Sequence, residues 1–441
     1  MPTKTFDSSP GYLKPEFEHM PVPDSHRKSL LSVIGVWFGF PMVLSNAVFG
    51  GVIVASLGFP LGLVAILLGN FVLALYVGAI SYRAGSTGLN FALIAQKTFG
   101  KKGYAVVSGL LATVVVGWYA FQVGLTGATM HTSFGSNELL MNLIAGLLYM
   151  ALTYVGIRAL TIIGWIAAPL YIVMGVSGIL LAIHHQSLVQ ILSYRPPRHL
   201  AGSVSFGVAL TMVVAGFSDS GTMTPDFTRW AKNGGHGILA ALSAFPLANM
   251  ISMVVGGLVV AAGAIANPIT NGGNFMMVLA GHGVLLEVLS IFFIFTNLGS
   301  VCSHCLYNGA VGWSHITGST MRKLTVILGI IGIIAAVAGI WNIFVTWLSF
   351  LGFVVPGIGA VIIVDQLIFP PSPDIPFKAW RPKAFIAWAL GSSAALWTQL
   401  SAPQYSEAVV GLAVAASVYF VMMLFDRQRV PIFRSRAVLR E

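Results

Sequence analysis

The chain has 441 residues, of which 56% are hydrophobic and only 8% are charged. A soluble domain carries roughly 25% charged residues, so the composition excludes an ordinary soluble protein and indicates a surface that meets hydrocarbon. The formal net charge of +10 does not indicate a nucleic-acid partner. The basic residues occupy short breaks between apolar runs, instead of one face with interleaved aromatic residues.

Residues 1–28 are polar and rich in proline, and they contain no short apolar core of the kind found in secretory leaders. We therefore expect a cytoplasmic N-terminal tail that ends in His26, Arg27 and Lys28.

Twelve apolar runs follow this tail, and each is long enough to cross a bilayer core, which takes about 20 helical residues. They lie near residues 29–57, 60–82, 103–130, 138–157, 160–183, 203–230, 236–266, 284–312, 324–340, 343–368, 384–401 and 405–425. The sequence thus predicts an all-α membrane protein with twelve transmembrane helices, followed by a basic cytoplasmic tail over residues 426–441.

The distribution of lysine and arginine supports this count. With the N-terminus inside, 21 of the 23 basic residues fall in cytoplasmic segments, and only Arg195 and Arg198 fall outside. Omission of one helix would invert every later loop and destroy the asymmetry, which follows the positive-inside rule. We expect a multi-pass protein of the cell (inner) membrane with both termini in the cytoplasm.

Two of the predicted spans contain helix breakers at mid-depth. The first holds Gly35, Gly39 and Pro41, and the sixth holds the stretch 216–221 (GFSDSG), followed by Pro225. Irregular backbone inside a membrane is tolerated where it is buried or lines a cavity. The alternative for each span is that glycine and proline serve helix packing.

The two interrupted spans are five apart in the chain. In transporters built from inverted repeats, the broken helices begin each half and hold substrate and ion near the midplane. The spacing therefore predicts a five-plus-five inverted repeat over residues 29–183 and 203–368, with two extra helices over 384–425.

Asp219 lies within the second break, where a carboxylate costs roughly 2.5–3.5 kcal/mol on insertion scales and so needs a partner or a function. Three interpretations stay open. It hydrogen-bonds the substrate, it carries a coupling proton, or it caps the second half-helix through the amide of Gly221 or Thr222. Asp226 and Asp365 lie near predicted helix ends, where we expect local charge pairs or turns.

Trp118 and Gln122 are four residues apart in the third span and therefore share one helical face. An indole offers a stacking surface for a planar ring, and an amide both donates and accepts hydrogen bonds. Phe217, in the sixth-span break, is a candidate for a second ring. The alternative for these aromatic residues is ordinary packing.

The eighth span contributes Asn297, Ser300 and His304. The first two are three residues apart and share a face, where they serve either a site or helix–helix hydrogen bonding. We expect His304 to be an interior histidine, with proton coupling as the alternative. Cys302 and Cys305 flank it at a spacing that is a weak metal signal, so we expect neither a metal nor a cofactor.

The stretch 221–230 (GTMTPDFTRW) resembles the segment after the broken sixth helix in the nucleobase–cation symporter-1 family. The match extends over about residues 22–425 and is closest to the bacterial cytosine permeases. Further matching segments, in the same order, are His26-Arg27-Lys28, Val116-Gly117-Trp118, Asn308 to Gly318 and Asn342 to Asp365.

This resemblance implies a LeuT-like fold with alternating access and a planar nitrogen heterocycle as substrate. It implies that the ring lies between Trp118 and Phe217. Gln122 matches an amide of the hydantoin-carrying member, and Asn297 matches a binding-site asparagine of the cytosine permeases. Asp219 stands where those permeases have a serine. An acid there suits a ring with an amino group beside a ring nitrogen, such as cytosine or guanine.

The resemblance also implies a sodium site, built from backbone carbonyls near Gly39 and Met42 and from two adjacent hydroxyls on the eighth helix. Here that pair reads Ser300-Val301, and valine supplies no side-chain oxygen, although sodium needs several hard oxygen ligands. The coupling cation therefore stays open between Na⁺ and H⁺, with Asp219 or His304 as the proton carrier.

We expect a secondary active importer of a nucleobase-like ring, cytosine or a purine first, by cation symport. The same fold carrying hydroxymethylpyrimidine, hydantoin or allantoin is the alternative. An intramembrane enzyme would need paired acids or a metal cage. A channel would need a filter-like run of backbone carbonyls. The sequence shows neither pattern. The expected partners are the heterocyclic substrate and the lipid bilayer, with no obligate protein subunit.

Overall fold

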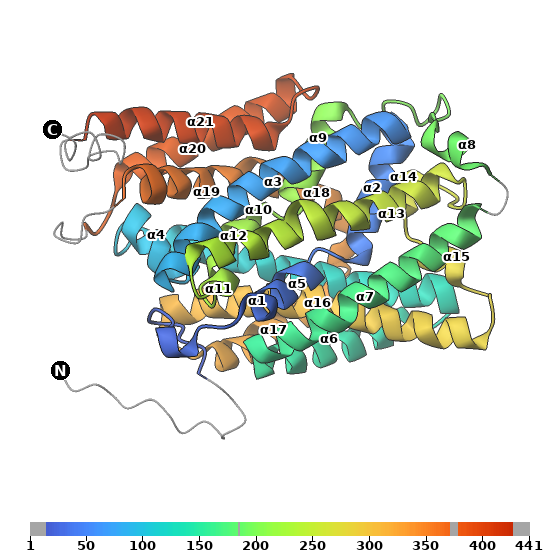
Figure 1. Cartoon of the computed structure of the whole chain (residues 1–441), viewed down its shortest axis with the longest axis horizontal. Helices are drawn as coiled ribbons and strands as arrows, with labels where there is room; N and C mark the ends of the chain where they lie inside the picture. Colours follow the sequence, from blue (N-terminus) through green and yellow to red (C-terminus); the bar gives the residue numbers. More distant parts are fainter. Residues whose placement is uncertain (1–14, 184–185, 371–377, 427–441) are drawn as a thin grey trace.

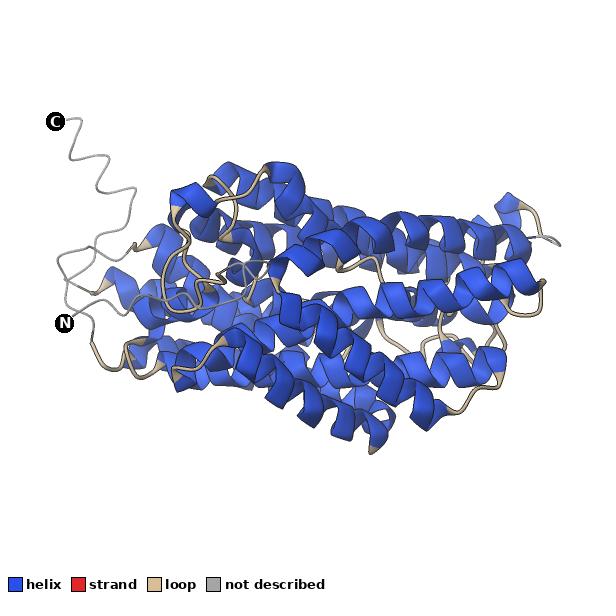
Figure 2. Ribbon diagram, turned by 90° about the horizontal axis from the view of Figure 1, so that it is seen from below, coloured by secondary structure: helices blue, strands red, loops and turns tan. Residues whose placement is uncertain are grey.

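The computed structural model describes residues 15–183, 186–370 and 378–426. Within these ranges the regular structure is helical, and the exception is an isolated bridge between Lys28 and Ala231. Figure 1 shows a bundle whose long helices run along one axis, and Figure 2 shows the loops gathered at its two ends. The prediction of an all-α protein is confirmed. Residues 1–14 and 427–441 of the predicted tails lie outside the described residues.

Eight helices of the described chain are long and apolar enough to cross a membrane, and nine if one bent pair counts as a single span. They are α3 (Phe59–Thr87), α5 (Tyr104–Phe134), α6 (Glu138–Val155), α7 (Ile157–Ala182), Gly234–Ala261, α16 (Val284–Thr317), Trp347–Ile368, α21 (Glu407–Leu424), and the bent pair α1 (Leu30–Gly39) and α2 (Leu44–Leu57).

Two of these spans are composite. The first joins α12 (Gly234–Leu242), η3 (Ser243–Ala248) and α13 (Asn249–Ala261), and the second joins α18 (Phe344–Val354), α19 (Pro356–Ile363) and η5 (Val364–Ile368). The other predicted spans correspond to α9 (Phe206–Ala215) with α10 (Ser218–Thr222) and α11 (Pro225–Thr228), to α17 (Met321–Val337), and to α20 (Pro382–Ser401). Helical segments therefore lie at every position where the sequence predicts a span.

Short elements connect these helices at the two ends of the bundle. One end holds α4 (Phe91–Phe99), α11 and η1 (Asp24–His26), and the other holds α8 (Leu188–Leu192), α14 (Pro268–Asn271) and α15 (Met276–Leu279). The described chain begins and ends at the α4 end (Figure 1).

Burial separates central helices from peripheral ones. The most apolar window of α5 is 78% buried, whereas that of α6 is only 28% buried. Large apolar side chains on the outer helices stand exposed, among them Leu147 at 54% and Ile334 at 62%. An apolar outer surface of this kind suits contact with lipid. The helix α5 lies in the interior, where a binding site can form around it.

Glycines let α2 and α13 pack backbone against backbone. A methyl group added at Gly50 would collide with the carbonyl of Met253, and one added at Gly256 would collide with the backbone of Ala47. Small residues at such crossings are typical of membrane helix pairs. This contact holds the second half of the first span against a neighbour more than 200 residues away in the chain.

The first span bends by 54° between α1 and α2. Pro41, which has no amide hydrogen to donate, lies in the gap, and Val43 is extended at φ −129° and ψ 150°. The side chain of Asn297, from α16, closes the gap. Its Oδ1 accepts from Leu44 N at 2.9 Å, and its Nδ2 donates to the Met42 carbonyl at 2.7 Å.

The sixth predicted span is interrupted between α9 and α10, where Phe217 leaves helical geometry at φ −135° and ψ 12°. The chain then continues as α10 and α11, of five and four residues, instead of one regular half-helix. Trp37 of α1 donates from Nε1 to Thr224 Oγ1 at 3.0 Å. The two interrupted segments therefore lie side by side in the interior.

The expected local charge interaction of Asp226 with Arg229 is present, but the expectation of a local role for Asp365 is wrong, and both acids reach distant elements. Asp226 Oδ1 accepts from Phe91 N at 3.0 Å, at the start of α4. Asp365 is fully buried and accepts from Arg381 at 2.9 Å and Tyr419 at 2.7 Å, so it ties η5 to α20 and α21. The sequence shows these acids near helix ends but not the partners that packing brings to them.

Candidate functional site

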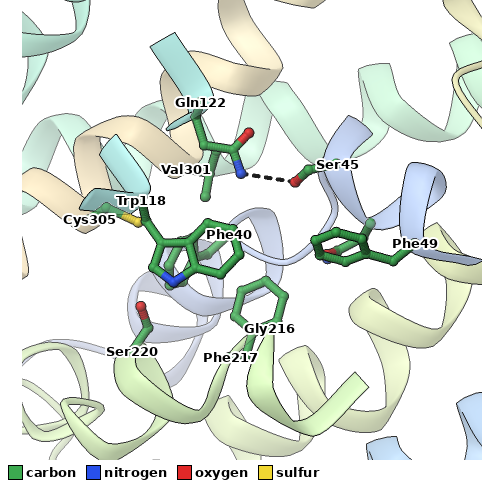
Figure 3. Close-up of a pocket in the computed structure, with 11 residues that line it drawn as sticks. Phe40, Ser45, Phe49, Trp118, Gln122, Gly216, Phe217, Ser220, Val301 and Cys305 are labelled. Atoms are coloured by element: carbon green, nitrogen blue, oxygen red, sulfur yellow. Dashed lines mark hydrogen bonds between the residues drawn. The ribbon is translucent and has the colours of Figure 1, made fainter. Parts of the chain in front are cut away.

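A small cavity lies where the gap between α1 and α2 meets the gap between α9 and α10, beside α5 and α16 (Figure 3). Its volume is about 10 Å³, enough for roughly one water molecule, so its walls have to move apart to admit a planar ring. It is lined by Phe40, Ser45, Asn46, Phe49, Trp118, Gln122, Gly216, Phe217, Ser220, Val301 and Cys305.

Three of the five predicted substrate-binding residues meet at this cavity. Trp118 and Gln122 project from the same face of α5, and Phe217 comes from the break after α9 (Figure 3). The Phe217 ring packs edge-on against Phe40, with 5.5 Å between ring centroids. With Phe49, which also lines the cavity, the structure thus places one indole and three phenyl rings around this space.

The amide of Gln122 supplies polar atoms to one wall of the cavity. Its Nε2 donates to Ser45 Oγ at 2.9 Å (Figure 3). Its buried Oε1 receives no hydrogen bond within the part of the chain that the structure describes. A buried acceptor without a partner is costly, so this oxygen is available to an N–H group of a ligand.

Asp219 is fully buried but is not among the residues that line the cavity. Its Oδ1 accepts from the amide of Ser220 at 2.7 Å, and the Trp118 indole interacts with its carboxylate. The N-cap position of α10 belongs to Phe217, whose carbonyl accepts from the amide of Gly221 at 2.7 Å. The predicted capping through Gly221 or the following amide is therefore wrong. The carboxylate instead interacts with the Ser220 amide and the Trp118 indole.

Asn297 is also absent from the cavity lining. Both ends of its amide are used by the gap between α1 and α2, as described above. The structure therefore places this residue at the backbone of the first break and does not bring it together with Trp118 and Gln122.

The predicted cation-site residues surround the same break. Gly39 ends α1 and packs against the backbone of Gly164 in α7. The Met42 carbonyl already accepts from Asn297 Nδ2, whereas Ser300 Oγ is buried with no hydrogen-bond partner in the described chain. One uncommitted hydroxyl is a sparse donor set for sodium.

His304 does not line the cavity, but it packs against Phe40, which does. Its Nδ1 is 2.6 Å from the Ser300 carbonyl, and its ring stacks on Phe40 with centroids 4.8 Å apart and an interplanar angle of 8°. This geometry matches the interior role expected for His304, whose ring packs against the Phe40 side chain of the cavity wall. No cluster of three or more metal-ligating side chains occurs in the described ranges.

The sequence interpretation missed several residues of the wall. Ser45 and Asn46 follow the first break directly, Phe40 precedes it, and Ser220 follows Asp219. Their signal was available, since polar residues next to a broken helix often face the site it forms. Which of them faces the cavity depends on how α2 and α10 rotate against α5.

Comparison with known proteins identifies the family. Residues 21–370 match the family model described as permeases for cytosine/purines, uracil, thiamine and allantoin. The chain belongs to this family. It is 31% identical over 352 residues to the cytosine permease of Escherichia coli strain K12, covering 80% of this chain and 81% of that protein. The cytosine permease of Escherichia coli O157:H7 matches to the same extent.

Solved structures support the fold. Mhp1, a nucleobase-cation-symport-1 family transporter in a closed conformation with bromovinylhydantoin bound, superposes with a TM-score of 0.75 at 18% identity, covering 95% of this chain and 98% of that one. A Na⁺-coupled sialic acid symporter superposes with a TM-score of 0.69 at 11% identity, covering 92% of each chain.

Membership in the permease family establishes a multi-pass membrane transporter and confirms the resemblance found in the sequence. The prediction that the protein is not an enzyme is confirmed on the same ground, because the family and the matched relatives are permeases.

Proposed function

We propose that this permease is a secondary active importer of a nucleobase-like ring, cytosine or a purine, by cation symport. The observation that carries the proposal is the convergence of Trp118, Gln122 and Phe217 on one cavity between two helix breaks. The match to cytosine permeases supports the substrate class.

The proposed architecture has twelve spans, in a five-plus-five inverted repeat with two extra helices. The 54° bend between α1 and α2 and the break after α9 support paired broken helices. The described chain begins and ends at one end of the bundle, which supports an even number of crossings. The distribution of lysine and arginine supports a cytoplasmic location for both termini, in the cell (inner) membrane. We propose no obligate protein subunit and no nucleic-acid partner.

In the proposed mechanism the ring stacks between Trp118 and Phe217, and the amide of Gln122 reads its edge. Stacking contributes roughly 1–3 kcal/mol per ring and tolerates many flat molecules, whereas polar groups left unpaired reject the wrong ones. The small closed cavity supports an occluded state of an alternating-access cycle. In this cycle the helices around the cavity separate to open it to one side of the membrane or to the other.

The coupling ion is Na⁺ or H⁺ in this proposal. Ser300 Oγ, which lacks a partner in the described chain, supports a sodium site near Met42. The hydrogen bond from Asn297 to the Met42 carbonyl and the hydrocarbon side chain of Val301 favour proton coupling, with Asp219 or His304 as carrier. Replacement of sodium by choline, with and without a proton ionophore, separates the two.

A second candidate substrate class is hydantoin, allantoin or hydroxymethylpyrimidine. It is favoured by Gln122 at the cavity and by the likeness to Mhp1 with bromovinylhydantoin bound. Competition by these compounds decides between the two classes.

The test is uptake of labelled cytosine by proteoliposomes that contain the purified protein, with purines, uracil, hydantoin, allantoin and hydroxymethylpyrimidine as competitors. We expect saturable uptake against a gradient, competed by amino-bearing rings. Liposomes without protein provide the control. Saturable uptake of none of these rings, with none stabilising the purified protein, would overturn the proposed function.

A further inference from the structure

Three buried asparagines form a continuous chain of hydrogen bonds that leads away from the cavity. Asn46, which lines the cavity, donates from Nδ2 to Asn249 Oδ1 at 2.8 Å. Asn249 donates from Nδ2 to Asn70 Oδ1 at 2.9 Å, and Asn70 donates to the Ile66 carbonyl at 2.9 Å. The chain crosses from α2 through α13 to α3, and each of its amides is at most 1% exposed.

Backbone carbonyls fix the direction of this asparagine chain at both ends. Asn46 Nδ2 also donates to the Pro41 carbonyl at 2.6 Å, and Asn70 Nδ2 meets the Ile66 carbonyl. A carbonyl only accepts hydrogen bonds, so a flipped amide at either end would set oxygen against oxygen. The middle amide of Asn249 then has a single consistent orientation, because it meets a donor on one side and an acceptor on the other.

The orientation decides which atom of Asn46 remains for a ligand. Both hydrogens of its Nδ2 are committed, to the Pro41 carbonyl and to Asn249. Both side-chain hydrogen bonds of Asn46 leave from Nδ2, so Oδ1 is the polar atom that this side chain can offer to the cavity. Gln122 differs, because its partner Ser45 is a hydroxyl that can donate or accept and therefore does not fix the amide.

We propose that Asn46 is a specificity-determining residue whose Oδ1 accepts an N–H of the substrate, and that Asn249 and Asn70 are positioning residues that hold it in this role. The inference rests on the proposed function and names its substrate class more closely. The ring has to present an N–H group to Asn46, whereas Gln122 can accept from the ring or donate to it, because its amide is not fixed. Methylation of the N–H that meets Asn46 is expected to weaken binding roughly tenfold or more, since it leaves a buried acceptor unpaired.

The probes are cytosine, 1-methylcytosine and N4,N4-dimethylcytosine, each measured as a competitor of labelled cytosine uptake and as a ligand that raises the Tm of the purified protein. The wild-type protein is expected to prefer cytosine to at least one methylated ring by tenfold or more. Asn46→Leu, which keeps the side-chain size but removes the acceptor, is expected to reduce that preference to within about threefold. Asn249→Leu is expected to reduce the preference for cytosine partly, although Asn249 does not line the cavity.

Ser252→Ala is the matched control, because Ser252 Oγ donates to the same Pro41 carbonyl at 2.9 Å but lies outside the asparagine chain and the cavity lining. Its preference for cytosine over the methylated rings is expected to equal that of the wild type. An unchanged preference in folded Asn46→Leu would overturn the inference. Since the wild-type measurement needs no variant, equal binding of all three rings by the native protein would overturn it as well.

The failure of the inference and that of the proposed function are distinguishable. If the wild-type protein takes up cytosine and binds both methylated rings equally well, the proposed transport function stands and the proposed role of Asn46 is wrong. If no ring is taken up or stabilises the protein, the proposed function itself fails.

Discussion

At the scale of single residues, the wall of the cavity depends on the indole of Trp118. This side chain is only 4% exposed, and it faces the cavity from the well-buried helix α5. Its neighbour across the break, Phe217, is equally buried. In the proposed mechanism, a substrate ring stacks on these two side chains only after the walls of the small cavity separate.

Trp118→Ala is expected to lower substrate affinity by roughly 1–3 kcal/mol, because it removes one stacking surface. Trp118→Phe keeps a ring and is expected to lose much less. Ligand-induced shifts of Tm in purified protein measure both effects. Equal affinity in the alanine variant and the wild type would contradict the stacking model.

Asp219→Asn tests the carboxylate that interacts with the Trp118 indole. The asparagine keeps an oxygen that can accept from the Ser220 amide and from the Trp118 indole, so we expect ring binding to change less than threefold. If Asp219 carries the coupling proton, the same variant loses accumulation against a gradient while it still exchanges substrate across the membrane. Counterflow and accumulation assays on one preparation separate these results. A large loss of binding itself would instead indicate direct contact with the ring.

At the scale of the elements, the first break depends on a side chain from another helix. Asn297 satisfies a donor and an acceptor of the gap between α1 and α2, and both would otherwise be buried without partners. An unpaired buried group of this kind costs about 1–3 kcal/mol. The position of α2, and of Ser45 and Asn46 on it, therefore depends on α16.

Asn297→Leu is expected to lower the Tm and the transport rate together, with the order of preference among competing rings unchanged. Asn297→Asp is the matched variant, since it can accept from the Leu44 amide but cannot donate to the Met42 carbonyl. Thermal unfolding and competition uptake give both readouts. A normal Tm with an altered order of preference would show that Asn297 contacts the substrate instead.

At the scale of the whole molecule, the segment from Pro15 to Lys28 joins distant helices at one end of the bundle. Glu16 is 3% exposed, and its carboxylate accepts from Tyr307 Oη at 2.8 Å and from Ile157 N at 3.1 Å. Arg229 donates to the carbonyl of Glu16 at 2.8 Å. This one residue therefore connects α7, α16 and the end of α11.

Burial raises the pKa of Glu16 from its ordinary value of 4.5 to about 6, although Tyr307 and Arg229 act in the opposite direction. The docked segment therefore binds the proton more readily than the released one. Docking is strongest below pH 4.5 and weakens as the pH rises through about 6, by at most about 2 kcal/mol.

A spin label on Ser25→Cys can measure this docking, because the two native cysteines are buried. We expect a larger mobile fraction at pH 7.5 than at pH 5. Glu16→Gln resembles the protonated carboxyl and is expected to remove the dependence on pH. A mobile fraction that changes equally with pH in both proteins would contradict this account.

The sequence by itself determined the all-helical membrane class, the positions of the apolar segments and the two breaks. Hydropathy is local, and a proline or a cluster of glycines inside an apolar run favours a kink or a break of the helix. The 3.6-residue period likewise placed Trp118 and Gln122 on one face before any partner was known.

Only the tertiary structure decided which polar side chains face the cavity. Asn46 lines it, Asn297 bonds to the backbone of the first break, and Asp219 interacts with the Ser220 amide and the Trp118 indole, although all three are polar residues near mid-span. Periodicity relates residues within one helix but not the rotation of that helix about its axis. That rotation is set by close contacts such as the crossing of Gly50 and Gly256, between segments more than 200 residues apart in the chain.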